Sequence, residues 1–291
     1  MDHFLRAAID QLLPAVCPVI AVYQDQIHVL GSSFVVFRFN EHEALLMTAK
    51  HVMDEVLRLH PGIARRMASP STLAPPLPSI GMQKHAEVVV MLSGKNGSIP
   101  RLARLLEVWS DPSLDLSLFA VRLQEEQPPW EFALFNLDSR PVMPGTEVFT
   151  LGFPNSARGA VFVDDVVQLQ LGFSYRGGKV VEHLPSGTML RKYPGFSTTM
   201  TIPSGMSGGP VFEIVGTDVR VRGVVCSSMG FIGDEEPADP NEPRSFVSAI
   251  EPAYRIQTAI ALPEIGVASL SLADLVRLGL INDARLPIAK P

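Results

Sequence analysis

Proline and glycine punctuate this sequence along its whole length, and they limit how far any regular element can run. The chain has 25 prolines and 22 glycines, and both are scattered rather than periodic. Because proline interrupts helices and glycine favours turns, the segments between them are short. These segments are rich in β-branched residues, which is typical of the strands of β-sandwiches and β-barrels. The sequence therefore predicts a mainly β fold.

Helical periodicity is confined to three places: the start, over Asp2 to Leu13, a short piece after His51, and the tail, where Ser271 could cap a helix over Leu272 to Leu280. Residues 61–84 are rich in proline, which predicts a long surface insertion. The expected strands are Val16–Tyr23, Ser33–Phe39, Ala44–Thr48, Ala86–Leu92, Leu116–Arg122, Glu147–Leu151, Ala160–Leu171, Val211–Val215, Val219–Val225 and Ser245–Ile250.

The composition is that of a chain that folds on its own and has no strongly charged partner. At 46% hydrophobic and 19% charged residues, the chain has enough apolar material for a core. A formal net charge of −6 and a pI near 5.7 leave no excess of lysine and arginine that could neutralise phosphates. We therefore expect neither nucleic acid nor an anionic membrane surface as a partner.

The cysteines and the longest apolar stretch bear on the cellular compartment. Cys17 and Cys226 are too few for a disulfide-stapled secreted domain, and they give no zinc-binding spacing. The stretch from Leu12 to Tyr23 is about half the length that a membrane-spanning helix needs, and it contains Pro14 and Pro18. No signal-peptide cleavage site follows it. We expect a cytoplasmic protein without a membrane segment.

The most specific segment is Pro203–Pro210, with the sequence PSGMSGGP, which lies between two strand-like runs. The glycines around Ser207 permit a sharp turn that exposes its hydroxyl, and they let a substrate carbonyl approach the backbone. The amides of Gly205 and Ser207 could then form an oxyanion hole. The alternative is a plain glycine-rich hairpin, because Gly-Ser turns are common.

A nucleophilic serine needs a base to take its proton and a carboxylate to orient that base. His51 lies where an apolar run gives way to a turn or short helix. Asp115 lies at the mouth of an apolar strand, where a buried carboxylate needs a hydrogen-bonding partner. Taken singly, each has an ordinary structural explanation. Together with Ser207 they give the order His, Asp, Ser, which chance explains poorly.

These three segments resemble the signature blocks of the chymotrypsin/trypsin-like serine peptidases. The block DPSLDLSL around Asp115 and the turn LGFP at Leu151–Pro154 are similar to those of the bacterial Deg proteases. The resemblance spans roughly residues 15–255 and implies two antiparallel six-stranded β-barrels with the site in the cleft between them. It implies that His51 and Asp115 come from the first barrel and Ser207 from the second.

Four segments follow from this resemblance. They are an N-terminal helical extension (1–14), the first barrel (15–130), the second barrel (131–255) and a C-terminal extension (256–291). The last segment is too short for the peptide-binding PDZ domain of the Deg proteases, so we expect no such domain.

Some features depart from the family pattern. Met206 replaces the aspartate that pairs with a newly cut N-terminus in zymogen-activated members, so that activation route is not expected. The interval from His51 to Asp115 is long, which leaves Asp111 as the second candidate acid. The α/β-hydrolases share the pattern around Ser207 but carry their histidine after the serine. All seven histidines of this chain precede Ser207, which excludes that family.

The same resemblance places the residue six positions before the nucleophile at the base of the primary specificity pocket. That residue is Thr201, and Cys226, Ser227 and Ser228 match the strand that pairs with the substrate backbone. Because no carboxylate lies at this base to attract arginine or lysine, we expect an uncharged, small to medium side chain before the scissile bond. We expect Cys226 to be a small buried hydrophobe rather than a reactive thiol.

The sequence thus predicts an intracellular serine endopeptidase that cleaves protein or peptide substrates without a metal or other cofactor. In this hypothesis His51 takes the proton from Ser207, and Asp115 fixes the imidazole tautomer. The amides of Gly205 and Ser207 hold the oxyanion. The alternative is a latent or non-catalytic barrel that serves as a binding or regulatory module and requires a protein partner.

Overall fold

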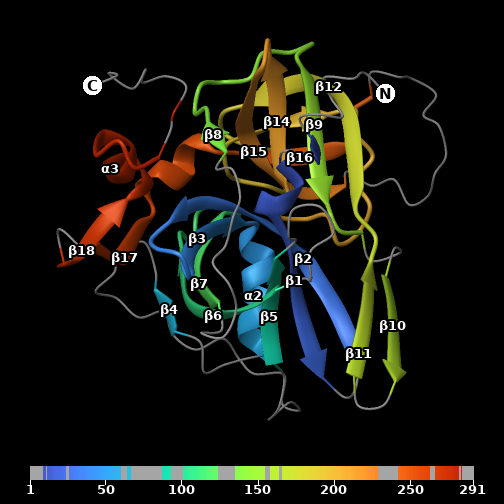
Figure 1. Ribbon diagram of the computed structural model, residues 1–291. Helices are drawn as coiled ribbons and strands as arrows, with labels where there is room; N and C mark the ends of the chain where they lie inside the picture. Colours follow the sequence, from blue (N-terminus) through green and yellow to red (C-terminus); the bar gives the residue numbers. More distant parts are fainter. Residues whose placement is uncertain are drawn as a thin grey trace.

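The computed structural model of the chain describes residues 9–10, 12–23, 26–59, 64–66, 87–92, 101–123, 135–154, 158–163, 166–228, 242–262, 266–281 and 283. Two closed antiparallel β-barrels lie one above the other and make up most of the molecule (Figure 1). The mainly β fold and the two six-stranded barrels predicted from the sequence are confirmed.

The first barrel closes because the two strands at the ends of its sheet pair with each other. The ring runs β6-β5-β1-β2-β3-β7, and β7 pairs back with β6. A short segment, β4 (Ala64–Arg66), lies parallel to β6 on the outside. The six strands are β1 (Val16–Tyr23), β2 (Gln26–Arg38), β3 (Glu43–Thr48), β5 (Glu87–Leu92), β6 (Arg101–Ser110) and β7 (Ser117–Leu123).

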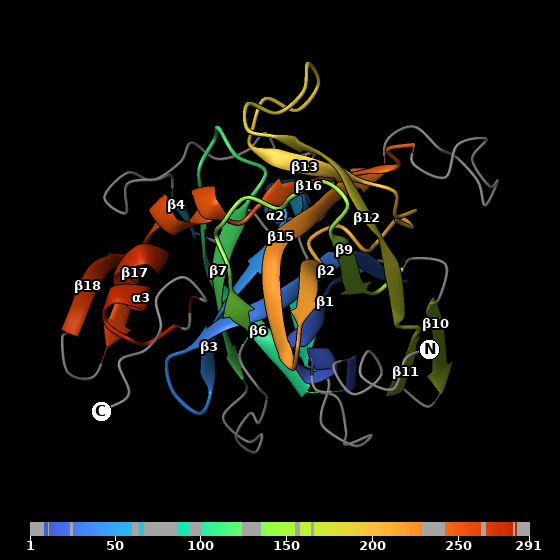
Figure 2. The same cartoon turned by 90° about the horizontal axis from the view of Figure 1, so that it is seen from above.

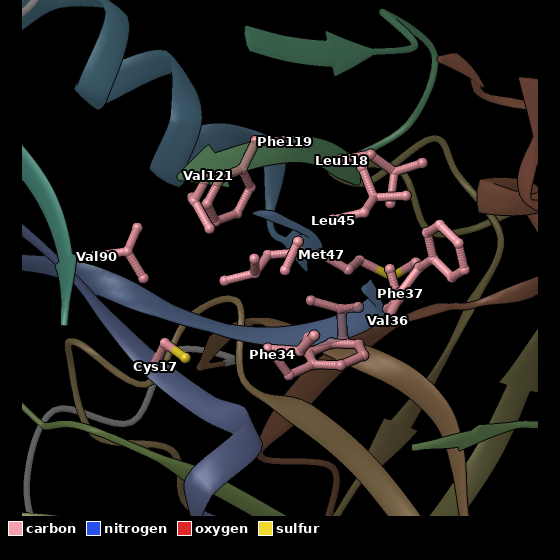
Figure 3. Packing of buried hydrophobic residues seen from close by; sticks show 14 of the residues in the cluster. Cys17, Phe34, Val36, Phe37, Leu45, Met47, Val90, Leu118, Phe119 and Val121 are labelled. Atoms are coloured by element: carbon pink, nitrogen blue, oxygen red, sulfur yellow. The ribbon is translucent and has the colours of Figure 1, made fainter. Parts of the chain in front are cut away.

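The core of the first barrel is built by apolar side chains on strands that are buried on both faces, as the consecutive buried residues of β3 and β7 show. Phe34 on β2, Met47 on β3 and Phe119 on β7 are fully buried. Figure 3 shows their side chains gathered in the space between the strands. Full burial of a side chain of this size stabilises the fold by about 1.5–3 kcal/mol. This packing holds the barrel ends, from which the candidate site residues emerge, in fixed positions.

The second barrel repeats the arrangement. The ring runs β14-β9-β12-β13-β16-β15, and β15 pairs back with β14, while β8 (Asn136–Leu137) lies parallel to β15 on the outside. A separate apolar cluster that includes Val148, Phe196 and Val225 fills it. The six strands are β9 (Glu147–Gly152), β12 (Ser174–Leu184), β13 (Gly195–Thr198), β14 (Pro210–Val215), β15 (Asp218–Ser228) and β16 (Ser245–Ala249).

Two hairpins lie beside the barrels, on opposite sides of the molecule in both views (Figures 1 and 2). One consists of β10 (Arg158–Val163) and β11 (Val166–Leu171). The single strand predicted over Ala160–Leu171 is therefore wrong. In the sequence, Asp164 and Asp165 separate two apolar runs, and aspartate is disfavoured in strands.

The other hairpin, β17 (Gln257–Leu262) with β18 (Gly266–Ser271), leads into α3 (Leu272–Arg277). Ser271 caps this helix as predicted: its hydroxyl accepts from the Asp274 N–H at 3.2 Å, and its own N–H donates to the Asp274 carboxylate at 2.9 Å. The helix ends before the predicted Leu280, because Gly279 adopts a φ of 71°, a left-handed conformation that stops a helix.

The remaining helical elements are short. They are the 3-10 helices η1 (Leu13–Ala15) and η4 (Glu251–Arg255), and α2 (Lys50–Leu59), which begins at the end of β3 where a helical piece was expected. The predicted N-terminal helix and the proline-rich insertion lie mostly outside the described residues. Within the described ranges, no helix combines the length and the apolar character needed to cross a bilayer. The predicted boundaries of the four segments remain predictions.

Candidate active site

His51 and Asp115 meet at one end of the first barrel. Thr48 at the end of β3 pairs with Ser117 at the start of β7, so the chain after Thr48 lies beside the chain before Ser117. His51 is in the first turn of α2, and its Nδ1 is 2.9 Å from Oδ2 and 3.2 Å from Oδ1 of Asp115. The backbone N–H of His51 also donates to Oδ1 of Asp115, at 3.0 Å. Two adjacent strand ends thus build an acid–base pair.

The environment of Asp115 keeps its carboxylate charged. Burial alone would raise the pKa of Asp115, but the hydrogen bonds and the charge of His51 outweigh it and hold this pKa below its usual value. A charged Asp115 accepts a hydrogen bond from the Nδ1–H of His51, which leaves Nε2 as the basic nitrogen. The His51 side chain is 47% exposed, so the ring is accessible to a reactant.

Asp111, the second candidate acid, forms hydrogen bonds within its own turn. Its Oδ1 accepts from the N–H of Ser113 at 2.8 Å and from the Ser113 hydroxyl at 2.6 Å. These contacts stabilise the turn between β6 and β7. The geometry therefore pairs His51 with Asp115 rather than with Asp111.

Ser207 lies in the loop between β13 and β14, in a backbone shaped by glycines. Gly205 and Gly208 have φ values of 95° and 89°, a region that other residues rarely adopt. The Ser207 hydroxyl donates to the carbonyl of Cys226 at 3.3 Å. Among the described contacts, no hydrogen bond joins Ser207 to His51. The structure thus places the serine in a turn as predicted, with its hydroxyl directed to β15.

The Ser207 loop is fastened to the first barrel through Ser32 of β2. The Ser32 N–H donates to the carbonyl of Ser207 at 2.7 Å, and the Ser32 hydroxyl donates to the carbonyl of Gly205 at 3.0 Å. The same hydroxyl accepts from the Phe153 N–H at 2.9 Å. Thr48 completes the set, since its hydroxyl donates to the Ser32 carbonyl at 2.7 Å. The sequence did not indicate a role for Ser32 or Thr48, because no local pattern around either residue points to this contact.

The approach of the two barrels explains one glycine of the motif. A Cβ on Gly208 would lie 2.0 Å from the carbonyl oxygen of Ser32 and 2.1 Å from Oγ1 of Thr48. Only a residue without a side chain fits there, and the positive φ imposes the same choice. Gly208 is therefore required by the contact between the barrels as well as by the turn.

Most N–H groups in the Ser207 loop are used within the protein. Those of Met206, Gly208 and Gly209 donate to the carbonyls of Pro203, Val225 and Met206. For the N–H groups of Gly205 and Ser207, the described residues supply no acceptor. These are the two amides from which the sequence predicts an oxyanion hole, and they are available for an external oxygen.

Two side chains of the second barrel reach Asp115. The Tyr193 hydroxyl donates to Oδ2 of Asp115 at 3.4 Å, and its ring packs edge-on against Phe246. The Cys226 Sγ lies 3.9 Å from the carbonyl oxygen of Asp115. Burial, and then the charge of Asp115, raise the pKa of Cys226 well above its usual value, so this thiol stays protonated and unreactive. Sequence analysis missed Tyr193.

The predicted substrate-binding residues lie along two segments beside Ser207. Cys226, Ser227 and Ser228 form the end of β15, which pairs with β16. Thr201 begins the segment that leads to Ser207, and its hydroxyl accepts from Nη1 of Arg244 at 2.7 Å. The Arg244 N–H in turn donates to the carbonyl of Thr198 at 2.8 Å. Arg244 was also missed by sequence analysis.

No cluster of metal-ligating side chains is found among the described residues. The described residues provide a mostly buried carboxylate paired with an accessible imidazole, and a serine hydroxyl in a glycine turn with two N–H groups that have no acceptor among these residues. These are the groups that acyl transfer to a serine needs.

Comparisons with known proteins bear on the family and the fold. The model of the family described as "Trypsin-like peptidase domain" matches residues 31–219, which is more than half of the chain. The crystal structure of Deg5 superposes with a TM-score of 0.53 at 15% identity, over 88% of this chain and 94% of that chain. The active form of the Rv3671c protease from M. tuberculosis gives a TM-score of 0.47 at 16% identity, over 96% of this chain and 84% of that chain.

No curated protein matches the sequence. The match of the family model, together with the two closed barrels, settles the family. The chain belongs to the trypsin-like peptidases and is an enzyme of the serine endopeptidase class.

Proposed function

We propose that this endopeptidase cleaves peptide bonds with Ser207 as nucleophile, His51 as general base and Asp115 as the group that orients His51. The observation that carries the proposal is the pair of hydrogen bonds from the His51 ring and backbone N–H to Asp115, at 2.9 and 3.0 Å. A carboxylate that holds the Nδ1–H fixes the tautomer in which Nε2 can accept a proton.

The reaction follows from the groups present. Oγ of Ser207 bonds to the scissile carbonyl carbon while its proton passes to Nε2 of His51. The negative charge that develops on the carbonyl oxygen is stabilised by the N–H groups of Gly205 and Ser207. His51 then gives its proton to the leaving amine as the C–N bond breaks. Water attacks the resulting ester by the same route, releases the acid product and restores Ser207.

The nucleophile must turn before it can react. Its hydroxyl donates to the Cys226 carbonyl at 3.3 Å, and rotation about its Cα–Cβ bond would free it from that carbonyl. A substrate that pairs with β15 offers backbone N–H groups to the same strand. Substrate binding at Cys226 would therefore release the hydroxyl for the reaction.

The cytoplasmic location is part of the proposal. Cys17 and Cys226 are both free and buried, which supports folding in a reducing compartment. Fractionation of cells that express the tagged protein would test the location independently of activity.

A latent barrel is the second candidate function, and one contact favours it. The serine hydroxyl is hydrogen-bonded to Cys226 and not to His51 among the described residues. If this arrangement persists with substrate present, the protein would bind peptides without cleaving them until a partner protein rearranges the loop. The two candidates differ in whether the serine is reactive in the isolated protein.

Reaction with a fluorophosphonate, followed by intact-mass spectrometry, separates the two functions. We expect one adduct on the wild-type protein and none on Ser207→Ala, with a strongly slowed reaction in His51→Ala. Ser204→Ala is the matched control, because it removes a hydroxyl from the same loop, and it should keep the adduct. A folded wild-type protein that forms no adduct would overturn the proposal and support the latent barrel.

A further inference from the structure

Tyr193 of the second barrel contacts the acid–base pair of the first. Its hydroxyl donates to Oδ2 of Asp115 at 3.4 Å, and the same oxygen lies 2.9 Å from Nδ1 of His51. The other carboxylate oxygen, Oδ1, accepts from the His51 N–H at 3.0 Å. Cys226 also lies beside Asp115, but a thiol is only a weak donor. The phenol is therefore a stronger donor to this aspartate than Cys226 is.

The ring of Tyr193 is held by the core of its own barrel. It packs edge-on against Phe246, with the ring centres 5.4 Å apart and the ring planes at 79°. Phe246 is fully buried on β16, where it pairs with Ser227 of β15. The guanidinium carbon of Arg191 lies 5.7 Å from the centre of the same Phe246 ring. The packing of the second barrel thus holds the Tyr193 ring independently of Asp115.

The loop between β12 and β13 folds back on the backbone of Tyr193 at Gly187. This glycine has a φ of 74°, in the left-handed region. A Cβ on Gly187 would lie 1.9 Å from the carbonyl oxygen of Arg191 and 2.6 Å from both N and O of Tyr193. After Tyr193, the Pro194 carbonyl accepts from the Ala249 N–H at 3.1 Å, which joins the loop to β16. The backbone of Tyr193 is therefore fixed from both sides.

The Tyr193 hydroxyl stays protonated and so remains a donor. Burial first, and then the nearby Cys226 and Asp115, raise the pKa of Tyr193 above its usual value, and Arg191 opposes this rise. A hydrogen bond donated to a carboxylate favours the charged form of that carboxylate. At 3.4 Å the bond to Asp115 is longer than most O–H···O bonds. Hydrogen bonds in active sites often tighten only when the substrate is bound.

We propose that Tyr193 is a positioning residue of the peptidase, which fixes the Asp115 carboxylate in the orientation that binds the Nδ1–H of His51. The inference rests on the proposed function of Ser207, His51 and Asp115. His51 and Asp115 pair within the first barrel, so Tyr193 restricts the carboxylate rather than creating the pair. Because its hydroxyl also stabilises the negative charge on Asp115, the Nδ1 proton stays on His51 while the imidazole is charged.

Tyr193→Phe tests this role, because it removes the hydroxyl and keeps the ring that packs on Phe246. We expect fluorophosphonate labelling to slow by about tenfold, as for loss of a hydrogen bond to a charged group. On a peptide that the wild type cleaves, kcat should fall by a similar factor and KM should stay the same, because Tyr193 acts through Asp115. The NMR signal of the His51 Nδ1 proton should move downfield, since its bond to Asp115 strengthens when a competing donor is lost.

Tyr175→Phe is the matched control. It removes a phenol from β12 of the same barrel, and no hydrogen bond joins Tyr175 to Asp115 among the described residues. This variant should keep the labelling rate and the His51 signal of the wild type.

Gly187→Ala tests the same role without changing the Tyr193 side chain. The added Cβ would displace the backbone of Tyr193, and the variant should show the slower labelling and the downfield shift. Gly216→Ala is its control, because Gly216 has a φ of 63° but a Cβ there meets no atom within 4 Å. If both changes act through one hydroxyl, Tyr193→Phe combined with Gly187→Ala should label no more slowly than the slower single variant.

The outcomes separate this inference from the proposed function. A wild-type protein that forms the adduct, with Tyr193→Phe labelling at the same rate, would overturn the role of Tyr193 alone. Slower labelling with an unchanged His51 signal would do the same, because it would indicate a general disturbance of the loop. Absence of any adduct on the wild type would overturn the proposed function and this inference with it. Circular dichroism checks the fold of each variant, and Tyr193→Phe decides if Gly187→Ala does not fold.

Discussion

The acid–base pair and the nucleophile loop are held in place in different ways. His51 and Asp115 are neighbours at one end of a single barrel, because β3 and β7 are adjacent strands. Their contacts to each other are short, at 2.9 and 3.0 Å. The second barrel adds longer contacts to Asp115, from Tyr193 at 3.4 Å and Cys226 at 3.9 Å.

The Ser207 loop belongs to the second barrel but is fastened to the first. Ser32 binds the carbonyls of Ser207 and Gly205, and Thr48 supports Ser32. The acid–base pair is thus a property of one barrel, whereas the position of the nucleophile is a property of the contact between two. Changes at that contact should impair the serine while leaving the pair intact.

Gly208→Ala should have the largest effect. The added Cβ would lie 2.0 Å from the Ser32 carbonyl oxygen, at a φ of 89°. We expect the loop to leave the first barrel and the rate of fluorophosphonate labelling to fall by about a thousandfold, as for loss of an aligned nucleophile and oxyanion site. The downfield NMR signal of the His51 Nδ1 proton should persist, because the pair is not touched.

Gly145→Ala is the control for this change. Gly145 has a similar φ of 83°, but a Cβ there meets no atom within 4 Å. This variant has the backbone strain but not the steric clash, so a fluorophosphonate should label it at almost the wild-type rate. Equal loss of labelling in both variants would show that strain, rather than the contact between barrels, explains the effect of Gly208→Ala.

Ser32→Ala should have the next largest effect. It leaves the carbonyl of Gly205 and the N–H of Phe153 without their hydrogen-bond partner, and each loss costs about 1–3 kcal/mol in a buried site. Because Gly205 carries one of the two proposed oxyanion donors, labelling should slow by about ten- to a hundredfold. This rate is measured by quenching the labelling reaction at successive times and analysing each sample by intact-mass spectrometry.

Ser33→Ala provides the matched comparison. The Ser33 hydroxyl is also buried, but it donates to the Cys17 carbonyl at 3.0 Å within the first barrel. This variant should lose stability and keep the labelling rate of its folded fraction. If Ser33→Ala slows labelling as much as Ser32→Ala does, the hydrogen bonds between the barrels have no special role in positioning Ser207.

The smallest expected effect is the contribution of Asp115 to the pH dependence of the free energy of unfolding. Its pKa in the folded protein lies below the unfolded value of 3.8, so its contribution is fully present above that value and is lost as pH falls through the folded pKa. At pH 7 we expect Asp115→Asn to lower the free energy of unfolding by about 2 kcal/mol, as for a hydrogen bond to a charged group. Below pH 4 the difference from the wild type should shrink.

Urea unfolding between pH 7 and pH 3 measures this dependence. Asp111→Asn is the control for a turn carboxylate, since Asp111 contacts Ser113 and not His51. It should keep the fluorophosphonate adduct, whereas Asp115→Asn should slow its formation. A pH-independent difference between the wild type and Asp115→Asn would contradict a charged pair in the first barrel.

The sequence predicted those parts of the molecule that depend on local pattern. Scattered proline and glycine predicted the β fold, and the turn around Ser207 was found because Gly205 and Gly208 are needed within a few residues of it. The Ser271 cap was predicted for the same reason, since its partner Asp274 is three residues away. Each of these features is complete within one short segment.

Strands without clear alternation were missed. The segment Arg101–Ser110 forms β6, but a bulge between Leu105 and Glu107 interrupts its pattern. The segment Ser174–Leu184 forms β12 and contains Gly177 and Gly178, which weaken a strand signal. There a Cβ on Gly178 would lie 2.7 Å from the Met200 side chain, so tertiary packing rather than local preference selects this glycine.

The supporting residues of the site could not have been found from the sequence. Ser32 bonds to Gly205 across 173 residues, and Tyr193 bonds to Asp115 across 78. Arg244 reaches Thr201 across 43 residues. Such contacts depend on how each barrel closes and how the two barrels pack together, and no short sequence motif predicts them. The sequence therefore pointed to the proposed reacting groups, while the structure adds the contacts that hold them.

The most direct test of this account is to locate the fluorophosphonate adduct by peptide mapping of the labelled wild-type protein. The account predicts that the phosphonyl group is on Ser207 and that its formation depends on His51. Modification of a different serine, or an adduct on Ser207 that forms equally fast in His51→Ala, would contradict it.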